Sequence, residues 1–427
     1  MKYRKMSVKT VTVLILLLIA VSVSGCYDQR EIDDLAYPLA VGLDIGEANI
    51  LRMTLQLAAP LAIGGGGGGE SGGGGGSSGT AETSSIITVD TPSIYSGLDM
   101  INNIVSKEIN LSHAKVIVIS RALAEKRIME YIQAIQRGRE FRPNMFILVS
   151  EDPPDEYLEH IKPILESNPS KYYELLLGKD YASFFEDMRM SDFHLASETD
   201  FREPTAILTG INKKESVDEL AESGNKEYAG KLEGVYKPAD IPIVSKQKNV
   251  VMGMAVFRNG RMVGTLNGVE SKCFQMVTGR YEHSYWAFPD AYAPDKMVVM
   301  DILQRNRPSV KAVLKDGKAL IDIMLDLEGD FTSIQSTYDY ESYPDIMERK
   351  ASEIIKNEIT TMLKKTTDEF NSDICGFGRY VKGKFMTLED WEKFNWPEHY
   401  SDTEFNVQVK MKIRRTGLII RSMGHKD

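Results

Sequence analysis

Residues 114–120 read AKVIVIS, a nearly continuous apolar run with the length of a buried strand. Before it lie an expected strand at residues 86–90 and the apolar stripe of a helix at residues 94–105. After it, residues 122–136 return to helical spacing and residues 145–150 form another apolar run. This alternation of strands and helices predicts a sheet covered by helices.

Two hairpins and a long helix are expected further along the chain. Asn259-Gly260 and Asp316-Gly317 each separate two apolar runs, and both dipeptides tolerate the positive φ that a type I′ turn requires. From residue 346 to 363, apolar residues recur every three or four positions, which predicts a helix with one apolar face. We expect this face to cover a sheet; a partner-binding helix is the alternative. The helix should stop before Gly376-Phe377-Gly378, and a strand should follow at residues 405–413. The predicted fold class is α+β.

Residues 64–79 read GGGGGGESGGGGGSSG. They match the dinucleotide-binding pattern GxGxxG only trivially, because no helix is expected to open on the last glycine. We interpret them as a flexible, disordered loop insert.

Residues 1–25 have the order of an export signal. Four basic residues lead into the apolar run of residues 11–23, which as a helix would span about 20 Å, short of the ~30 Å hydrocarbon layer. The small residues Ser24 and Gly25 then precede Cys26, as in a bacterial lipobox. We predict that Cys26 becomes the new N-terminus and carries an S-diacylglycerol and an N-acyl group. An uncleaved anchor with an unmodified Cys26 is the alternative.

Charge and cysteine content narrow the possible partners. Without the four basic residues of the leader, the 51 basic residues fall to 47 against 61 acidic ones, a net charge of −14. A nucleic-acid partner is not expected, because phosphate binding requires a positive surface. Apart from Cys26, only Cys273 and Cys375 remain; their spacing does not decide whether they pair, and we expect two free thiols.

No enzyme motif is found. Outside the glycine-rich run of residues 64–79, the chain lacks GxSxG, HExxH, GxxxxGK[ST] and CxxC, and its six histidines are not spaced as a metal pair. His113 has no nucleophile motif or second histidine near it in sequence, so we interpret it as structural, at the start of a strand. We therefore expect no catalytic residues, no cofactor and no metal.

Several separate stretches resemble one known family. The run GCYDQREIDDLA, residues 25–36, is similar to the opening signature of the Ger(x)C family, the lipoprotein C subunits of spore nutrient germinant receptors; Tyr27 stands where that family usually has Trp. NLSHAKVIVIS (110–120) and GMAVFRNGRMVGTLNGVES (253–271) also resemble the family. So do three C-terminal segments, residues 373–380, 391–397 and 412–418.

The resemblance implies a non-enzymatic, lipid-anchored subunit that acts beside an A subunit and a permease-like B subunit. Its expected location is the outer face of the spore inner membrane. It also implies three mixed α/β domains, each a sheet covered by helices, with antiparallel hairpins in the second and third. On this chain we place an N-terminal domain at residues 26–200, a middle domain at 201–285 and a C-terminal domain at 286–427.

Two other functions stay open. A lipid-anchored solute-binding protein of a transporter would have two doubly wound lobes around a cleft. A cell-wall hydrolase would need a catalytic pair that the sequence does not display. A further question concerns a row of basic residues near the C-terminus, which is either solvated or placed against anionic lipid. Its members are Lys410, Lys412, Arg414, Arg415 and Arg421.

Overall fold

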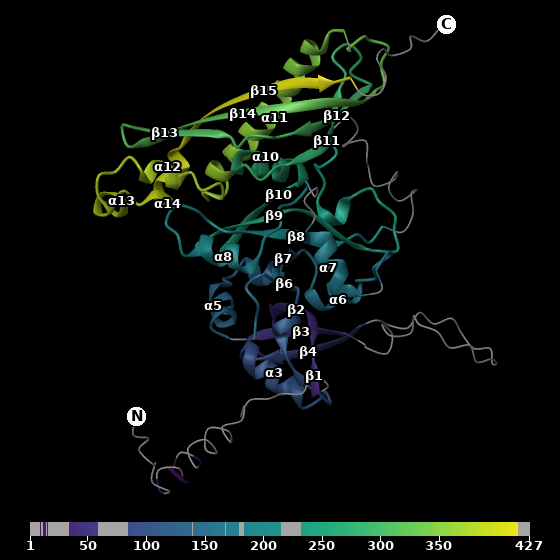
Figure 1. Ribbon diagram of the computed structural model, residues 1–427, viewed down its shortest axis with the longest axis vertical. Coiled ribbons are helices and arrows are strands. Elements are labelled where there is room, and N and C mark those ends of the chain that lie inside the picture. The colour runs from purple at the N-terminus through teal and green to yellow at the C-terminus, as the bar shows by residue number, and fades with distance from the viewer. Residues whose placement is uncertain are drawn as a thin grey trace, which may run out of the picture.

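The computed structural model describes residues 34–58, 84–138, 140–166, 168–178, 183–214, 232–340 and 342–416, together with Lys9, Thr12, Val13 and Ile15. These residues form helices and two large sheets, which confirms the predicted α+β class. Figure 1 shows the first sheet running from the lower end of the molecule past its middle, and the second sheet above it. Most of the predicted leader, Cys26 and residues 64–79 lie outside the described residues.

The first sheet has eight strands. They are β2 (Pro38–Ile45), β3 (Leu51–Ala58), β4 (Ser84–Thr91), β6 (Val116–Ser120), β7 (Phe146–Ser150), β8 (Thr205–Ile211), β9 (Asn249–Arg258) and β10 (Arg261–Leu266). Their spatial order is β10-β9-β8-β7-β6-β2-β3-β4. The four central strands, β8, β7, β6 and β2, pair in parallel, and the strands on either side of them pair antiparallel.

The central strands are continuous apolar runs because both of their faces are covered. All five residues of β6 and all five of β7 are buried, as expected for parallel strands between helical layers. The interpretation of AKVIVIS as a buried strand is confirmed. A short parallel pair, β1 (Leu35–Ala36) and β5 (Glu108–Ile109), lies at the lower end of the molecule (Figure 1).

Six helices accompany these strands within the described residues. They are α3 (Ile94–Asn102), α4 (Arg121–Ala124), α5 (Met129–Arg137), α6 (Pro154–Glu159), α7 (Pro169–Leu177) and α8 (Met190–Ser197). The helix predicted over residues 122–136 is two helices, because the chain breaks at residues 125–128, where Ile128 N–H donates to the carbonyl of Gly260 in the β9-β10 turn. Helix α7 ends at Leu177, and further along the chain the Met188 carbonyl accepts a hydrogen bond from Ile147 N–H of β7.

The second sheet has five strands. They are β11 (His283–Pro289), β12 (Met297–Leu303), β13 (Ser309–Lys315), β14 (Lys318–Ile334) and β15 (Glu404–Arg415). The first four pair antiparallel in the order β11-β12-β14-β13, and β15 lies parallel along the other edge of β14.

Both predicted hairpins are confirmed. Asn259 and Gly260 have φ of 51° and 75° between β9 and β10, and Asp316 and Gly317 have φ of 51° and 79° between β13 and β14. These are the left-handed conformations that a type I′ turn requires.

Five further helices belong to the later part of the described chain. They are α10 (Gly268–Thr278), α11 (Pro344–Asp368), α12 (Gly378–Lys382), α13 (Leu388–Phe394) and α14 (Trp396–His399). The long helix predicted around residues 346–363 is α11, and its apolar face, including Met347, Ile355 and Ile359, is fully buried and packs on β15 and α10. The interpretation of this face as a cover for the sheet is confirmed. The helix stops before Gly376, as predicted.

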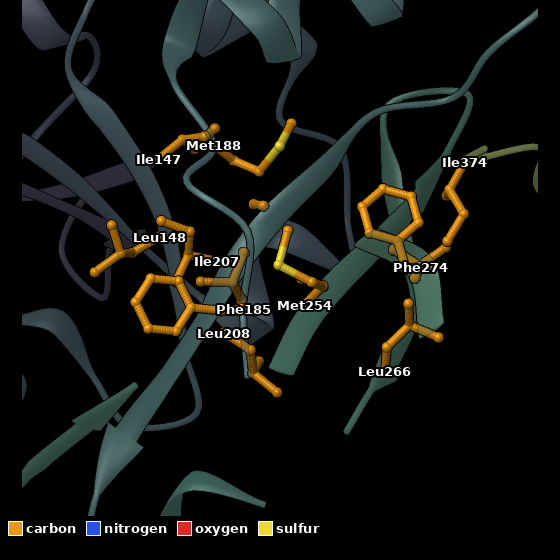
Figure 2. Packing of buried hydrophobic residues seen from close by; sticks show 14 of the residues in the cluster. Ile147, Leu148, Phe185, Met188, Ile207, Leu208, Met254, Leu266, Phe274 and Ile374 are labelled. Atoms are coloured by element: carbon orange, nitrogen blue, oxygen red, sulfur yellow. The ribbon is translucent and has the colours of Figure 1, made fainter. Parts of the chain in front are cut away.

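A continuous hydrophobic core joins the two sheets through α10. This helix packs on β9 and β10 of the first sheet and on β14 and α11 of the second. Figure 2 shows side chains of this core, among them Leu148, Ile207, Met254 and Phe274. Strands β8, β9 and β10 come from the predicted middle domain, yet they belong to the same sheet as the strands of the predicted N-terminal domain. The division into three domains stays a prediction.

Candidate functional site

The predicted lipid acceptor, Cys26, lies outside the described residues. The continuous description begins at Asp34, directly before β1, at the lower end of the molecule's long axis (Figure 1). Among the described residues, no helix combines the length and the hydropathy that a bilayer crossing requires.

The basic row of β15 is matched by acidic side chains. Lys412 Nζ lies 3.0 Å from Glu348 Oε1 on α11, and Arg414 Nη2 lies 2.9 Å from Glu328 Oε1 on β14. In the strand register, Lys410 stands opposite Asp326. These neighbours offset much of the positive charge, which favours the solvated interpretation of the row over lipid contact. Arg421 lies outside the described residues.

A groove of about 910 Å³ runs between α11 and the β14-β15 edge. Two side chains of α11 cover backbone donors of the edge strand: Ser352 Oγ accepts from Met411 N–H at 3.1 Å, and Glu348 Oε1 accepts from Ile413 N–H at 2.9 Å. These contacts satisfy donors that an open edge would present to another strand. The groove is therefore a protected sheet edge with charges of both signs.

A buried carboxylate connects several C-terminal elements. Asp373 is only 4% exposed, and its Oδ1 accepts from the N–H groups of Gly376 and Phe377 at 2.8 and 3.0 Å. Its Oδ2 accepts from Gly378 N–H at 2.7 Å and from Trp396 Nε1–H at 2.9 Å. Burial raises the pKa of Asp373 from 3.8 to about 6, although the four donors oppose that shift. We call Asp373, Gly376–Gly378 and Trp396 the Asp373 junction.

The Asp373 junction also reaches the first sheet. Ser372 Oγ–H donates to the Phe257 carbonyl of β9 at 2.6 Å, and Glu203 N–H, just before β8, donates to the Asp373 carbonyl at 2.9 Å. The Glu203 carboxylate accepts from Asn259 N–H at 3.2 and 3.3 Å, in the β9-β10 turn. Three stretches that resemble the Ger(x)C family, residues 253–271, 373–380 and 391–397, thus meet in one place.

Helix α10 is buried on all sides although it carries polar residues. The Lys272 side chain is fully buried; its Nζ pairs with Glu233 and donates to the Tyr285 carbonyl at 2.9 Å. Burial lowers the pKa of Lys272, while Glu233 opposes that shift. Glu270 accepts from Lys365 Nζ of α11 at 2.9 Å. These pairs connect α10 to both layers and leave no polar face open to solvent.

Helix α10 is not among the helices expected from the sequence, although the sequence carries a signal for it. Asn267 and Glu270 form a capping box: Asn267 Oδ1 accepts from Glu270 N–H at 2.9 Å, and Glu270 Oε2 accepts from Asn267 N–H at 2.7 Å. An Asn followed three residues later by Glu is a recognisable helix start.

His113 and the two later cysteines lie in packed parts of the protein. His113 ends the short 3₁₀ helix before β6, with its ring edge-on to Tyr37 at a centroid distance of 4.5 Å. Partial burial, with help from Arg142 and Lys115, lowers the pKa of His113. Cys273 and Cys375 are free, buried thiols, which confirms that expectation. Nowhere in the described part of the chain do three His, Cys, Asp or Glu side chains gather as a metal site.

Comparisons with known proteins agree over most of the chain. Residues 28–212 match the family model described as the spore germination protein N-terminal domain, and residues 252–417 match the model described as spore germination B3/GerAC like, C-terminal.

Individual relatives cover the chain to different extents. Spore germination protein KC of Bacillus subtilis (strain 168) is 22% identical over 428 residues, which cover 98% of each chain. Spore germination protein B3 of the same organism is 20% identical over 39% of this chain and 45% of its own. The crystal structure of the GerBC protein matches with a TM-score of 0.50 at 14% identity, over 87% of this chain and 96% of that one, and shows the shared fold.

Proposed function

Because this chain belongs to the GerAC-like family of spore germination proteins, we propose that it is the lipid-anchored C subunit of a nutrient germinant receptor. The observation that carries the proposal is that this chain matches both family models and also has a lipobox directly before the first match. The N-terminal match begins at residue 28, two residues after Cys26, and the C-terminal match runs to residue 417. The similarity to protein KC covers 98% of each chain, so the likeness extends along nearly the full length of both sequences.

The anchor is assigned to Cys26. After removal of residues 1–25, the thiol would carry a diacylglyceryl group and the new amino group an acyl chain. At ~0.8 kcal/mol per buried CH₂, two long chains supply on the order of 20 kcal/mol of gross burial, whereas one chain gives only marginal binding. The protein is thereby held on the outer face of the spore inner membrane.

We assign the subunit a non-enzymatic role beside the A and B subunits. The buried ionised groups at the Asp373 junction and around α10 serve internal bonds that hold the two sheets together. Because these bonds hold the two sheets in one arrangement, the protein can present a fixed surface to neighbouring subunits. The sheet order also differs from two similar doubly wound lobes, since the second sheet is antiparallel except for β15, which weighs against the solute-binding alternative.

Replacing Cys26 with Ala tests the proposal. Spores that carry C26A should lose the protein from the inner-membrane fraction and respond weakly to nutrients, because the acyl acceptor is gone. S24A is the matched control: it changes a neighbouring position but keeps a small residue before the cysteine. Mass spectrometry of the native N-terminus should find an acylated Cys26 in wild type and in S24A.

Three results would contradict the proposal. They are an intact leader on the native protein, full membrane retention of C26A, and normal nutrient-triggered germination of C26A spores. Tight binding of a nutrient to the purified subunit alone, measured by calorimetry, would favour the solute-binding alternative. Turnover of peptidoglycan fragments by the purified protein would favour the hydrolase.

A further inference from the structure

Four arginines line one cavity of about 390 Å³. Arg202 comes from the segment before β8, Arg280 follows α10, Arg307 lies between β12 and β13, and Arg379 belongs to α12. No Asp or Glu is among the described residues that line this cavity. We call it the arginine cavity. It lies where elements from the two sheets meet, close to α10.

Arg202 is the most enclosed of the four, and two of its three guanidinium nitrogens lack hydrogen-bond partners. Its Nε and Nη2 atoms are buried, and neither has a hydrogen-bond partner within the described protein. Asp373 is close enough to influence the pKa of Arg202, but its two oxygens already accept four hydrogen bonds. A buried donor without an acceptor costs roughly 1–3 kcal/mol, and more when it is charged. A hydrogen-bond acceptor bound inside the cavity would therefore stabilise the Arg202 guanidinium.

The other three arginines add positive charge that is only partly offset. Arg280 forms an ion pair with the buried Glu186 behind it. Arg379 lies over the ring of Tyr380, with its Cζ 4.8 Å from the ring centroid. Burial lowers the pKa of Arg202 and of Arg280, and the positive charge of Arg379 lowers both further. The guanidinium groups thus repel one another, and an anion among them would remove that repulsion.

The walls combine tight backbone turns with apolar surface. Gly279 and Gly376 both line the cavity and have φ of 72° and 73°. A Cβ at Gly279 would come within 3.0 Å of Pro308 Cδ and 3.2 Å of Arg307 Cγ, so a larger residue would displace the Arg307 side of the wall. Val277 and Pro308 provide apolar contact surface beside the charged groups.

We propose that the arginine cavity binds a small soluble anion that carries at least two phosphate or carboxylate groups. Guanidinium groups hold such groups through paired N–H···O bonds, which suits four arginines from four separate segments. A volume of about 390 Å³ fits a small molecule and lies at the lower end of the range of ligand pockets. This site is independent of Cys26 and goes beyond the proposed function. A phospholipid headgroup shares the chemistry, but the cavity lies near α10, well above the end of the molecule where the described chain begins (Figure 1).

Calorimetric titration of the full-length protein tests the site. Pyrophosphate and citrate serve as probes in a phosphate-free chloride buffer, at matched ionic strength. At least one probe should bind saturably with a one-to-one ratio. The variants R307Q and R379Q should weaken its Kd at least tenfold; both positions are exposed, so their folding is not at stake. The matched control is R305Q, two residues from Arg307 in the same loop, whose side chain pairs with Glu328 instead of lining the cavity.

Each other outcome overturns the proposal. If neither probe binds the wild-type protein, the cavity is not a site for small polyanions. If R305Q weakens binding as much as R307Q, the effect is general surface charge. Vesicles of phosphatidylcholine with and without phosphatidylglycerol form the second arm. Binding to the anionic vesicles that R307Q abolishes, without binding of either soluble probe, would assign the cavity to a lipid headgroup.

Discussion

Glu203 gives the sharpest test of how the two sheets are joined. Its carboxylate accepts the N–H of Asn259 in the β9-β10 turn, and its own N–H donates to the Asp373 carbonyl. Burial raises the pKa of Glu203 from 4.5 to about 7, against the opposing effects of the Asn259 N–H and of Arg258. The folded protein therefore holds a proton on Glu203 that the unfolded chain releases at lower pH.

The sign of the pH effect follows from this difference. Below pH 4.5 both states are protonated and the contribution of Glu203 to stability is fully present. As the pH rises through 7, the folded state must ionise a buried carboxyl, and the contribution is lost. A difference of about 2.5 pKa units corresponds to about 3 kcal/mol, at roughly 1.4 kcal/mol per unit.

The variant E203Q should remove this loss, because a neutral amide cannot ionise. Its Oε1 can still accept the Asn259 N–H. We expect E203Q and wild type to have similar free energies of unfolding near pH 4.5. At pH 8.5 the variant should be more stable by about 2–3 kcal/mol. Asp373 titrates in both proteins, but its negative charge also raises the pKa of Glu203, and that coupling is absent in the variant.

Urea unfolding at a series of pH values measures this difference. Trp286, Trp391 and Trp396 are all buried, so tryptophan fluorescence reports the loss of tertiary structure. The control is E404Q, which neutralises an exposed carboxylate at the start of β15 and should give a difference from wild type that does not vary with pH. A pH-independent difference between E203Q and wild type, or a variant less stable at pH 8.5, would refute the reasoning.

Two further substitutions test the local geometry. G378A should destabilise the protein by ~1–3 kcal/mol, because a Cβ there would lie 2.6 Å from the Trp396 ring. The control G383A should change stability little, because its Cβ would meet nothing closer than 3.8 Å. If the two variants lose equal free energy in urea unfolding, the close contact with Trp396 is not the cause. N267A should cost ~1–2 kcal/mol by removing the acceptor of Glu270 N–H at the start of α10, while N267D should keep most of the stability. Similar losses in both variants at Asn267 would rule out the cap as the cause.

Local patterns were enough to predict most strands and hairpins. Both covered faces of β6 appear in the sequence as the apolar run AKVIVIS, and the turn at Asn259-Gly260 depends on two adjacent residues that tolerate positive φ. The long helix α11 has a regular apolar face because one side of it packs on the second sheet. In each case the determining residues lie within a few positions of one another.

Elements that depend on distant partners were not predictable in this way. The capping box at Asn267 marks the start of α10, but the burial of Lys272 and Glu270 depends on their distant partners Glu233 and Lys365. Likewise, the four donors to Asp373 come partly from Trp396, 23 residues away. Sequence similarity marked these stretches, but only the fold shows that they meet.

If Cys26 carries a lipid, as proposed, its position in the sequence limits which part of the molecule can contact the bilayer. Asp34 lies eight positions after Cys26, and a fully extended chain of that length reaches at most about 28 Å. The first sheet spans seven strand spacings of ~4.8 Å, about 34 Å from β4 to β10, and α10 adds a further layer before the second sheet (Figure 1). If Cys26 carries the lipid, β15 touches the membrane only when the molecule lies on its side.

The charges of β15 give little reason for that orientation, since Lys412 and Arg414 already pair with Glu348 and Glu328. An upright molecule then holds α10 and the arginine cavity well clear of the headgroups, in water. In that position the cavity meets dissolved anions and not lipid, which is why a soluble polyanion is the ligand to test first.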